Sequence, residues 1–250
     1  MSLLNEGLLK KTLIAALLLG GVSMASASAS AAEVSGNVTF ATDYRFRGIS
    51  QGDRSMAVQG GFDVAWENGF YAGTWASNVT FSGAAIETDL YFGYGGSFND
   101  AVSYDVGYIY YAYPEDDSDP DLDYQEIYGS VSFNVVTLGL AYSNDYFAET
   151  DTFLYLYGDV SFPLGENFSL DAHLGWNSFD DDDSFASFIG PAAGEDPGSD
   201  YIDYSIGIST SAGGLDFGAA FIGTDLDEDE CFAGSKLCDD TIVLSVSKSL

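Results

Sequence analysis

Positive charge is scarce in this chain. Only 7 of its 250 residues are Lys or Arg, against 39 Asp or Glu, so the net charge is −32. A protein that binds nucleic acid needs a basic face for the phosphates, so nucleic acid is excluded as a partner. One His and two Cys are too few for a His-based zinc enzyme, a four-Cys zinc site or a disulfide-dense scaffold. We therefore expect no cofactor, no resident metal and no catalytic residues.

Long apolar runs are confined to the N-terminus. Lys10 and Lys11 precede an apolar core at residues 13–19, and small residues fill positions 25–32. This layout predicts a cleaved secretory signal peptide over residues 1–32. An N-terminal membrane anchor is the alternative, which the short apolar core disfavours. The mature part, 33–250, carries a net charge of −33 and has no run long enough for a transmembrane helix. It can therefore cross a membrane only as a β-barrel.

The mature part is rich in residues that favour strands. In the full sequence Tyr (17), Phe (18) and Gly (29) are abundant and Pro (5) is rare, and in the mature part apolar and polar residues alternate with period two. Each alternating stretch is about ten residues or slightly longer, the length that a tilted strand needs to cross a bilayer. We predict twelve strands, near residues 34–47, 55–67, 69–80, 86–98, 101–113, 124–134, 136–147, 152–162, 167–179, 200–211, 214–224 and 239–250.

Short and longer connections alternate between these strands. Tight turns such as Asn68-Gly69 are followed by longer, often acidic segments near 48–54, 81–85, 114–123, 148–151, 180–199 and 225–238. Outer-membrane barrels have short periplasmic turns and longer external loops. The fold class predicted is all-β: an up-and-down antiparallel transmembrane β-barrel of about twelve strands in the outer membrane of a Gram-negative bacterium. Aromatic residues at strand ends are expected to form two girdles at the lipid headgroups, with Tyr44, Phe46, Trp176 and Phe179 at the outer level and Trp66, Phe70, Phe162 and Phe168 at the inner level.

Four segments resemble a known family. They are residues 40–51 (FATDYRFRGISQ), 58–63 (VQGGFD), 69–78 (GFYAGTWASN) and 243–249 (VLSVSKS). The chain is similar in these segments to the TorF-type porins, a conserved hypothetical, Gcw_chp-like family of Gram-negative outer-membrane proteins. The resemblance implies an outer-membrane barrel with a role in transport, and it implies no catalytic residues. The chain ends in Leu250, where members of the family usually end in an aromatic residue.

Charged residues are expected to face the lumen, because a charge exposed to lipid near the midplane costs about 2–4 kcal/mol. Glu126 and Asp159 share faces with Tyr residues and are assigned to the lumen as well. An acidic lumen concentrates cations and repels anions. A solvated face of a soluble sheet is the alternative for all of these acids. The predicted lumen-lining residues are Asp43, Arg45, Arg47, Asp63, Glu87, Asp89, Asp105, Asp171, His173, Asp203 and Asp216.

Arg45, Arg47 and Arg54 form the one basic cluster of the sequence. With facing carboxylates they would create a transverse field at a constriction. Buried ion pairing that stiffens the lumen wall is an equally weighted alternative. Twelve strands lie between the narrow eight-stranded barrels and the wide porins, and five aromatic side chains are expected to point inward. A narrow or partly blocked pore and an open pore are both consistent with Tyr71, Trp75, Tyr91, Tyr111 and Tyr113 in the lumen.

The loops offer two further features. Alternating Asp residues at 116–123 resemble the start of a calcium loop, but counting from Asp117 the positions that need Gly and Glu hold Leu122 and Tyr128, so an EF-hand is excluded. Weak binding of divalent cations at the external loops is the alternative to plain solvated acids. Cys231 and Cys238 share the last external loop, and export to an oxidising compartment predicts a disulfide between them.

The predicted function is a porin-like channel for passive diffusion of small polar solutes or ions, with a preference for cations. The alternatives are a non-conducting structural or surface-binding barrel with acidic external loops, and a secreted soluble β-sandwich. Catalysis is disfavoured, since a lipase-type barrel needs a Ser with a His base, and His173 lies mid-strand on the polar face beside Asp171.

Overall fold

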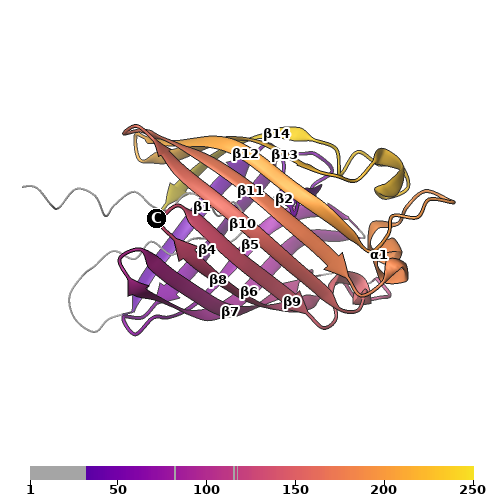
Figure 1. Ribbon diagram of the computed structural model, residues 1–250, viewed down its shortest axis with the longest axis horizontal. Coiled ribbons are helices and arrows are strands. Elements are labelled where there is room, and N and C mark those ends of the chain that lie inside the picture. The colour runs from indigo at the N-terminus through magenta and orange to yellow at the C-terminus, as the bar shows by residue number, and fades with distance from the viewer. Residues whose placement is uncertain (1–31, 82, 115, 117) are drawn as a thin grey trace, which may run out of the picture.

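The alternating stretches pair in sequence order and close into a ring of twelve antiparallel strands (Figure 1). The computed structural model describes residues 32–250 except 82, 115 and 117, so the predicted signal peptide lies, apart from residue 32, outside the described residues. Closure comes from β1, which pairs with both β4 and β14. The barrel strands are β1 (Glu33–Ala41), β4 (Ala57–Ala65), β5 (Phe70–Phe81), β6 (Ala84–Asn99), β7 (Val102–Ala112), β8 (Tyr124–Phe133), β9 (Val136–Ser143), β10 (Phe153–Leu164), β11 (Phe168–Phe179), β12 (Asp200–Ala212), β13 (Leu215–Thr224) and β14 (Thr241–Ser249).

The predicted barrel of twelve strands is confirmed, and two predicted strands are too long. The stretch 34–47 leaves the wall after Ala41, and its remainder enters a short hairpin of β2 (Arg45–Phe46) and β3 (Ile49–Ser50). The stretch 136–147 leaves the wall after Ser143, shortly before a 3-10 turn, η1 (Phe147–Glu149). A period-two pattern marks extended backbone, but it does not say whether the chain is still in the wall.

The outside of the barrel is apolar and the inside is polar. On β9, Leu138 and Leu140 are 64% and 44% exposed, whereas Ala141 and Ser143 are buried. On β12, Ile206 and Ile208 are likewise exposed, and the alternate residue Ser209 is buried. A soluble sheet buries such apolar faces, so this inverted arrangement fits a surrounding of lipid.

The two ends of the barrel differ. At one end, the turn end, which also holds the C-terminus, strands are joined by short turns such as Trp66–Gly69 (Figure 1). At the other, the loop end, the connections are longer and carry η1, α1 (Asp182–Ile189) and η2 (Glu228–Glu230). The longer connection predicted near 81–85 is wrong in length, because β5 ends at Phe81 and β6 begins at Ala84.

The helix α1 was not predicted, since its acidic start suggested a solvated loop. Asp181 caps it by accepting a hydrogen bond from the Ser184 backbone N–H, which lowers the pKa of the Asp181 carboxyl. Gly190 ends it in the left-handed conformation, and Phe185 and Ile189 are fully buried. Among the described residues, no helix is long and apolar enough to cross a membrane.

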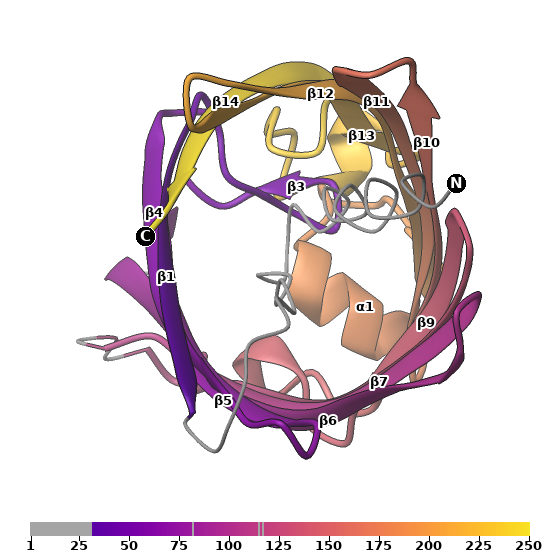
Figure 2. The same ribbon diagram turned by 90° about the vertical axis from the view of Figure 1, so that its left-hand side faces the viewer.

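The loop end of the barrel is filled by chain. Figure 2 shows β3, α1 and the last loop inside the outline of the ring. We call residues 42–56, which join β1 to β4 and contain β2 and β3, the plug. Around it the loops and wall contribute a buried aromatic cluster, in which the rings of Tyr146 and Phe153 stack 4.0 Å apart. The barrel is therefore packed at its loop end.

The expected outer aromatic girdle is partly wrong. Tyr44 and Phe179 are only 4% and 5% exposed, and Phe46 packs against the buried cluster inside the barrel. Trp176 is exposed, as are Trp66, Phe70, Phe162 and Phe168 from the inner set. Tyr44 and Phe46 belong to the plug, where the inward fold of the chain buries them, which the alternation of residue types does not reveal.

Ile206→Arg tests the inverted arrangement. Ile206 lies at the middle of β12 and is 53% exposed. We expect the substitution to lower the free energy of unfolding in lipid vesicles by about 2–4 kcal/mol, because it places a charge at the midplane. The adjacent Ser205 lines an internal cavity, so Ser205→Arg, measured in the same urea titration, should cost clearly less. Equal losses from the two variants would contradict a lipid-facing β12.

Candidate functional site

A cavity of about 580 Å³ lies inside the barrel. Its lining extends from Trp66 and Phe70 at the turn end to the plug, where Arg45 and Arg47 contribute. Tyr71, Tyr91, Tyr128 and Tyr157 also line it, together with five wall carboxylates and one histidine. These six residues are Asp105, Glu126, Asp159, Asp171, His173 and Asp203.

Asp63, Asp105 and Asp171 are wall carboxylates that bond to hydroxyl groups. Tyr91 donates a hydrogen bond to Asp63, and Tyr71 donates one of 2.8 Å to Asp105. Ser161 donates a hydrogen bond of 2.7 Å to Oδ1 of Asp171, and Ser209 donates one of 2.7 Å to Oδ2. Hydroxyl donors stabilise a carboxylate without neutralising it. Among the described residues, no ion pair includes any of these three carboxylates.

His173 lies between two carboxylates. Its Nδ1 is 2.6 Å from Asp159 and its Nε2 is 2.9 Å from Asp203, and Nε2 also lies 2.7 Å from the Tyr155 hydroxyl. The expected neighbour Asp171 is instead bound by Ser161 and Ser209. With both ring nitrogens occupied, His173 is not placed to serve as a base for a nucleophilic Ser.

A second group of acids lines the wall beside the plug. Glu87 accepts hydrogen bonds from Tyr44 (2.7 Å) and Tyr113 (2.9 Å) and is 2% exposed. Glu126, also 2% exposed, pairs with Arg47 at 2.8 Å. Asp89 is 5% exposed, and among the described residues its Oδ1 has no hydrogen-bond partner. The plug therefore contacts a wall with several buried carboxylates.

The two arginines of the plug make buried ion pairs. Arg45 pairs with Asp43 at 2.6 Å and donates to the backbone oxygens of Gly48, Leu237 and Asp239. Arg47 pairs with Glu126, whereas Arg54 makes an exposed pair with Asp239 at 3.3 Å. Of the two alternatives left by the sequence, buried ion pairing describes these contacts. The arginines stand on the plug, however, and not on the strand β1 to which the alternation had assigned them.

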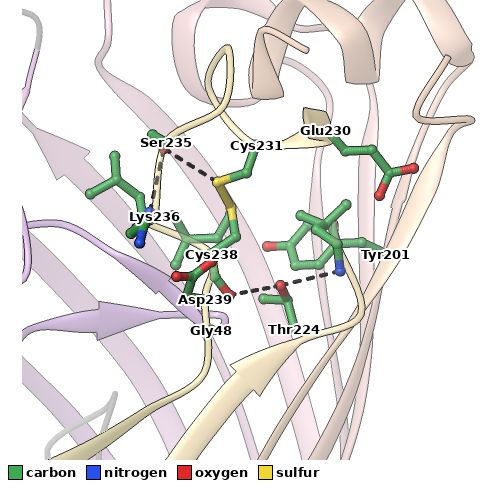
Figure 3. Close-up of a disulfide and its surroundings, with 12 residues drawn as sticks. Gly48, Tyr201, Thr224, Glu230, Cys231, Ser235, Lys236, Cys238 and Asp239 are labelled. Atoms are coloured by element: carbon green, nitrogen blue, oxygen red, sulfur yellow. Dashed lines mark hydrogen bonds between the residues drawn. A yellow bond between two sulfur atoms is a disulfide. The ribbon is translucent and has the colours of Figure 1, made fainter. Parts of the chain in front are cut away.

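The last loop is closed by a disulfide. Cys231 and Cys238 are joined with an S–S distance of 2.03 Å, and the Thr224 hydroxyl donates to the backbone oxygen of Cys238 (Figure 3). Gly48 of the plug lies against the same region, with a positive φ of 82° and no room for a Cβ beside Thr224. The disulfide loop therefore rests on the plug.

The structure also describes the surroundings of Asp216 and the positions of potential metal ligands. Asp216, near the turn end of β13, is half-buried and accepts a hydrogen bond from Ser211. Within the described residues, no group of three or more His, Cys, Asp or Glu is placed to hold a metal ion.

The site also includes residues that the sequence did not single out. Tyr146, Phe153 and Tyr155 surround Arg47, and Asn177 donates to Asp203 at 2.7 Å. For the plug, the sequence did contain a sign that the segment leaves the barrel wall. The run Arg45-Phe-Arg47-Gly48 combines two of the few cations with a glycine, which is unusual for a membrane-spanning strand.

By its fold the chain is a closed twelve-stranded antiparallel β-barrel, a fold that it shares with solved porins. The KdgM porin shares it with a TM-score of 0.56 at 12% identity, over 86% of this chain and 99% of that one. The NanC porin shares it with a TM-score of 0.54 at 11% identity, over 87% of this chain and all of that one (100%). Residues 25–250 match the family described as a bacterial protein of unknown function, Gcw_chp, and the chain belongs to this family. No curated protein matches the chain.

Removal of the disulfide tests its role in holding the last loop. The pair Cys231→Ser and Cys238→Ser should destabilise the loop by about 2–3 kcal/mol, the chain-entropy value for a short closed loop. Hydrogen exchange of the amides in 231–239 should then become about 30–150-fold faster, while β9 amides on the far wall stay unchanged. Uniform acceleration over the whole barrel would show that the disulfide stabilises the barrel rather than the loop.

Proposed function

We propose that this protein is an outer-membrane channel of the porin class, in a Gram-negative bacterium, through which small polar solutes or ions diffuse passively, with a preference for cations. The observation that supports this most is the acidic, tyrosine-lined cavity inside a closed barrel with an apolar exterior. The resemblance to TorF-type porins agrees with it. In this proposal the turn end faces the periplasm, the loop end faces outward, and outer-membrane lipids surround the strands.

The proposed preference for cations follows from the charged groups of the lumen, where, among the described residues, the arginines are paired with carboxylates and several carboxylates have no cationic partner. Arg45 and Arg47 each pair with a carboxylate of their own, so they do not reverse the sign of the lumen. In the described part of the chain, Asp105 and Asp171 bond to hydroxyls and not to a cation, inside low-dielectric walls that focus the potential of charged groups on the cavity. One KdgM porin structure holds oligogalacturonate, an acidic sugar chain. The charge of this lumen opposes such a polyanion, so we do not propose it as a solute here.

The filled loop end of the barrel favours a second candidate function. The plug, α1 and the disulfide loop fill the loop end (Figure 2), as expected of a non-conducting structural or surface-binding barrel. Current through the refolded protein separates the two functions. A barrel that inserts into bilayers and never conducts would be the second candidate, with the acidic loops as its contact surface.

Reversal potentials across a KCl gradient test the cation preference. The refolded protein should conduct K⁺ in preference to Cl⁻ in planar bilayers, and the double variant Asp105→Asn, Asp171→Asn should reduce that preference roughly two- to fivefold. This factor corresponds to an interaction energy of about 1 kcal/mol or less between one carboxylate and an ion that passes it in partly hydrated space. Asp196→Asn removes a charge from an exposed loop and is the matched control. An anion-selective protein, or an equal effect of Asp196→Asn, contradicts the proposal.

A further inference from the structure

The few cations of this chain are concentrated where the barrel is closed. After residue 32 the sequence holds five Lys and Arg, and three of them, Arg45, Arg47 and Arg54, belong to the plug. We propose that the barrel wall carries a guanidinium-binding pocket, occupied by the chain's own Arg47, and that this contact is the latch of a gate formed by the plug. The proposal rests on the channel function proposed above.

The pocket recognises both the charge and the flat faces of a guanidinium group. Arg47 Nη2 lies 2.8 Å from Glu126 Oε1, and Nη1 donates to the Tyr146 hydroxyl at 3.2 Å. Arg47 Cζ lies 4.3 Å from the centre of the Tyr155 ring and 4.7 Å from that of Phe153. Carboxylate pairing combined with ring contacts is the chemistry that binds guanidinium more strongly than a simple cation.

The pocket is built by the wall and one loop. Glu126 comes from β8, Phe153 and Tyr155 come from β10, and Tyr146 comes from the loop between β9 and β10. From the plug itself, Phe46 adds a ring 4.7 Å from Arg47 Cζ. The site on the wall would therefore persist if the plug moved away, and it would then be open to a free guanidinium ion.

The plug can leave without breaking the barrel. β2 and β3 pair with each other in a two-stranded sheet, and the twelve wall strands form a closed sheet without them. Backbone hydrogen bonds tie the plug to its surroundings one at a time, such as Thr80 N–H to the Gln51 oxygen and Ser50 N–H to the Leu237 oxygen. Side chains add the Tyr44–Glu87 hydrogen bond, the bonds from Arg45 to the last loop, and the Arg47 contacts. Release of the plug breaks these contacts but leaves the membrane-spanning ladder intact.

Arg47 is the contact on which closure depends most. Without it, Glu126 would stay buried with no cation, near the buried carboxylates Glu87 and Asp89. An unpaired buried charge strongly destabilises the state that buries it. The closed arrangement should then become unfavourable, and the plug should move to let water reach the carboxylates. Arg54 differs, because its pair with Asp239 is exposed.

Single-channel recording of the refolded protein tests the latch. Arg47→Ala should raise the ratio of open to closed time on the order of 100-fold or more, as for the loss of one partner of a buried ion pair. Arg54→Ala removes the same charge from the same segment and should change the ratio by less than about fivefold, the range of an exposed ion pair. An equal effect of the two variants would assign closure to net charge and overturn the latch.

Chemical rescue distinguishes a pocket from general loosening. Millimolar guanidinium chloride should lower the open fraction of Arg47→Ala, because the ion neutralises Glu126 and binds the closed state more tightly, where Phe46 of the plug adds a ring to the pocket. Wild type should not respond, since the tethered Arg47 has a high effective concentration. Tetramethylammonium chloride carries the same charge without N–H donors and should not rescue. Rescue by both salts alike would overturn a guanidinium-specific site.

A labelling assay follows the plug independently of current. Ser50 is 4% exposed, and the two native cysteines are disulfide-bonded. In a Ser50→Cys background a membrane-impermeant maleimide should react slowly, Arg47→Ala should accelerate the reaction, and guanidinium should slow it again. Faster, guanidinium-sensitive labelling without any current would uphold the gate and refute the channel. Current in both proteins, with labelling and open fraction unchanged by Arg47→Ala, would refute the gate and leave the channel.

A second variant covers a failure of Arg47→Ala to fold, which heat-dependent gel migration detects. Glu126→Gln keeps the size of the side chain and one acceptor oxygen, and removes the charge that Arg47 pairs with. It should raise the open fraction in the same direction by a smaller factor, and guanidinium should not reverse the effect. An open fraction equal to that of wild type would overturn the latch.

Discussion

The structure depends on one constraint, which is that no backbone N–H or C=O can be left unpaired in hydrocarbon. The ladder between β1 and β14 meets it by closing the sheet, and this closure creates an inside. Once a ring exists, residues that alternate along each strand are sorted between lipid and lumen. Leu138 and Ile206 are then free to be exposed, whereas Asp63 and Asp105 find hydroxyl partners two strands away on the inner face of the wall. The polar interior is a consequence of closure.

Closure alone does not make an open pore, because a twelve-stranded ring is narrow enough for side chains and short loops to fill. Here the two halves of the lumen are filled differently. Toward the turn end, serines and tyrosines line a cavity. Toward the loop end, the plug meets Tyr146, Phe153 and Phe179 in a dense aromatic cluster. The same barrel thus combines a cavity toward the turn end with a packed loop end, which solutes would have to pass in the proposed channel.

Much of this could be predicted from the sequence, and the failures have physical causes. Ten of the twelve predicted strands agree with the observed bounds to within two residues, because period-two alternation in a two-sided wall is a strong signal. Tyr44 and Phe46 continue that alternation into the plug, so the pattern could not show where the wall ends. The pairing of His173 with Asp159 and Asp203 depends on strand register, which single residues do not encode. The helix α1 did carry a signal in Asp181, Phe185 and Gly190, but its acidic start outweighed it.

Ion pairs that hold the plug affect how readily the plug could leave its closed position. An apolar plug of the same size would be held by burial alone, and ions and changes in the lumen would barely affect it. Arg45 and Arg47 are instead dehydrated beside carboxylates, where the cost of removing charges from water offsets much of their attraction. Because the desolvation cost and the attraction nearly cancel, such an ion pair contributes little net stability to the closed state. Loss of one partner leaves the other charge buried and unpaired, which strongly favours the open state. In the proposed gate, the two ion pairs bring the closed and open states close in free energy, which is the property that distinguishes a gate from a permanent wall.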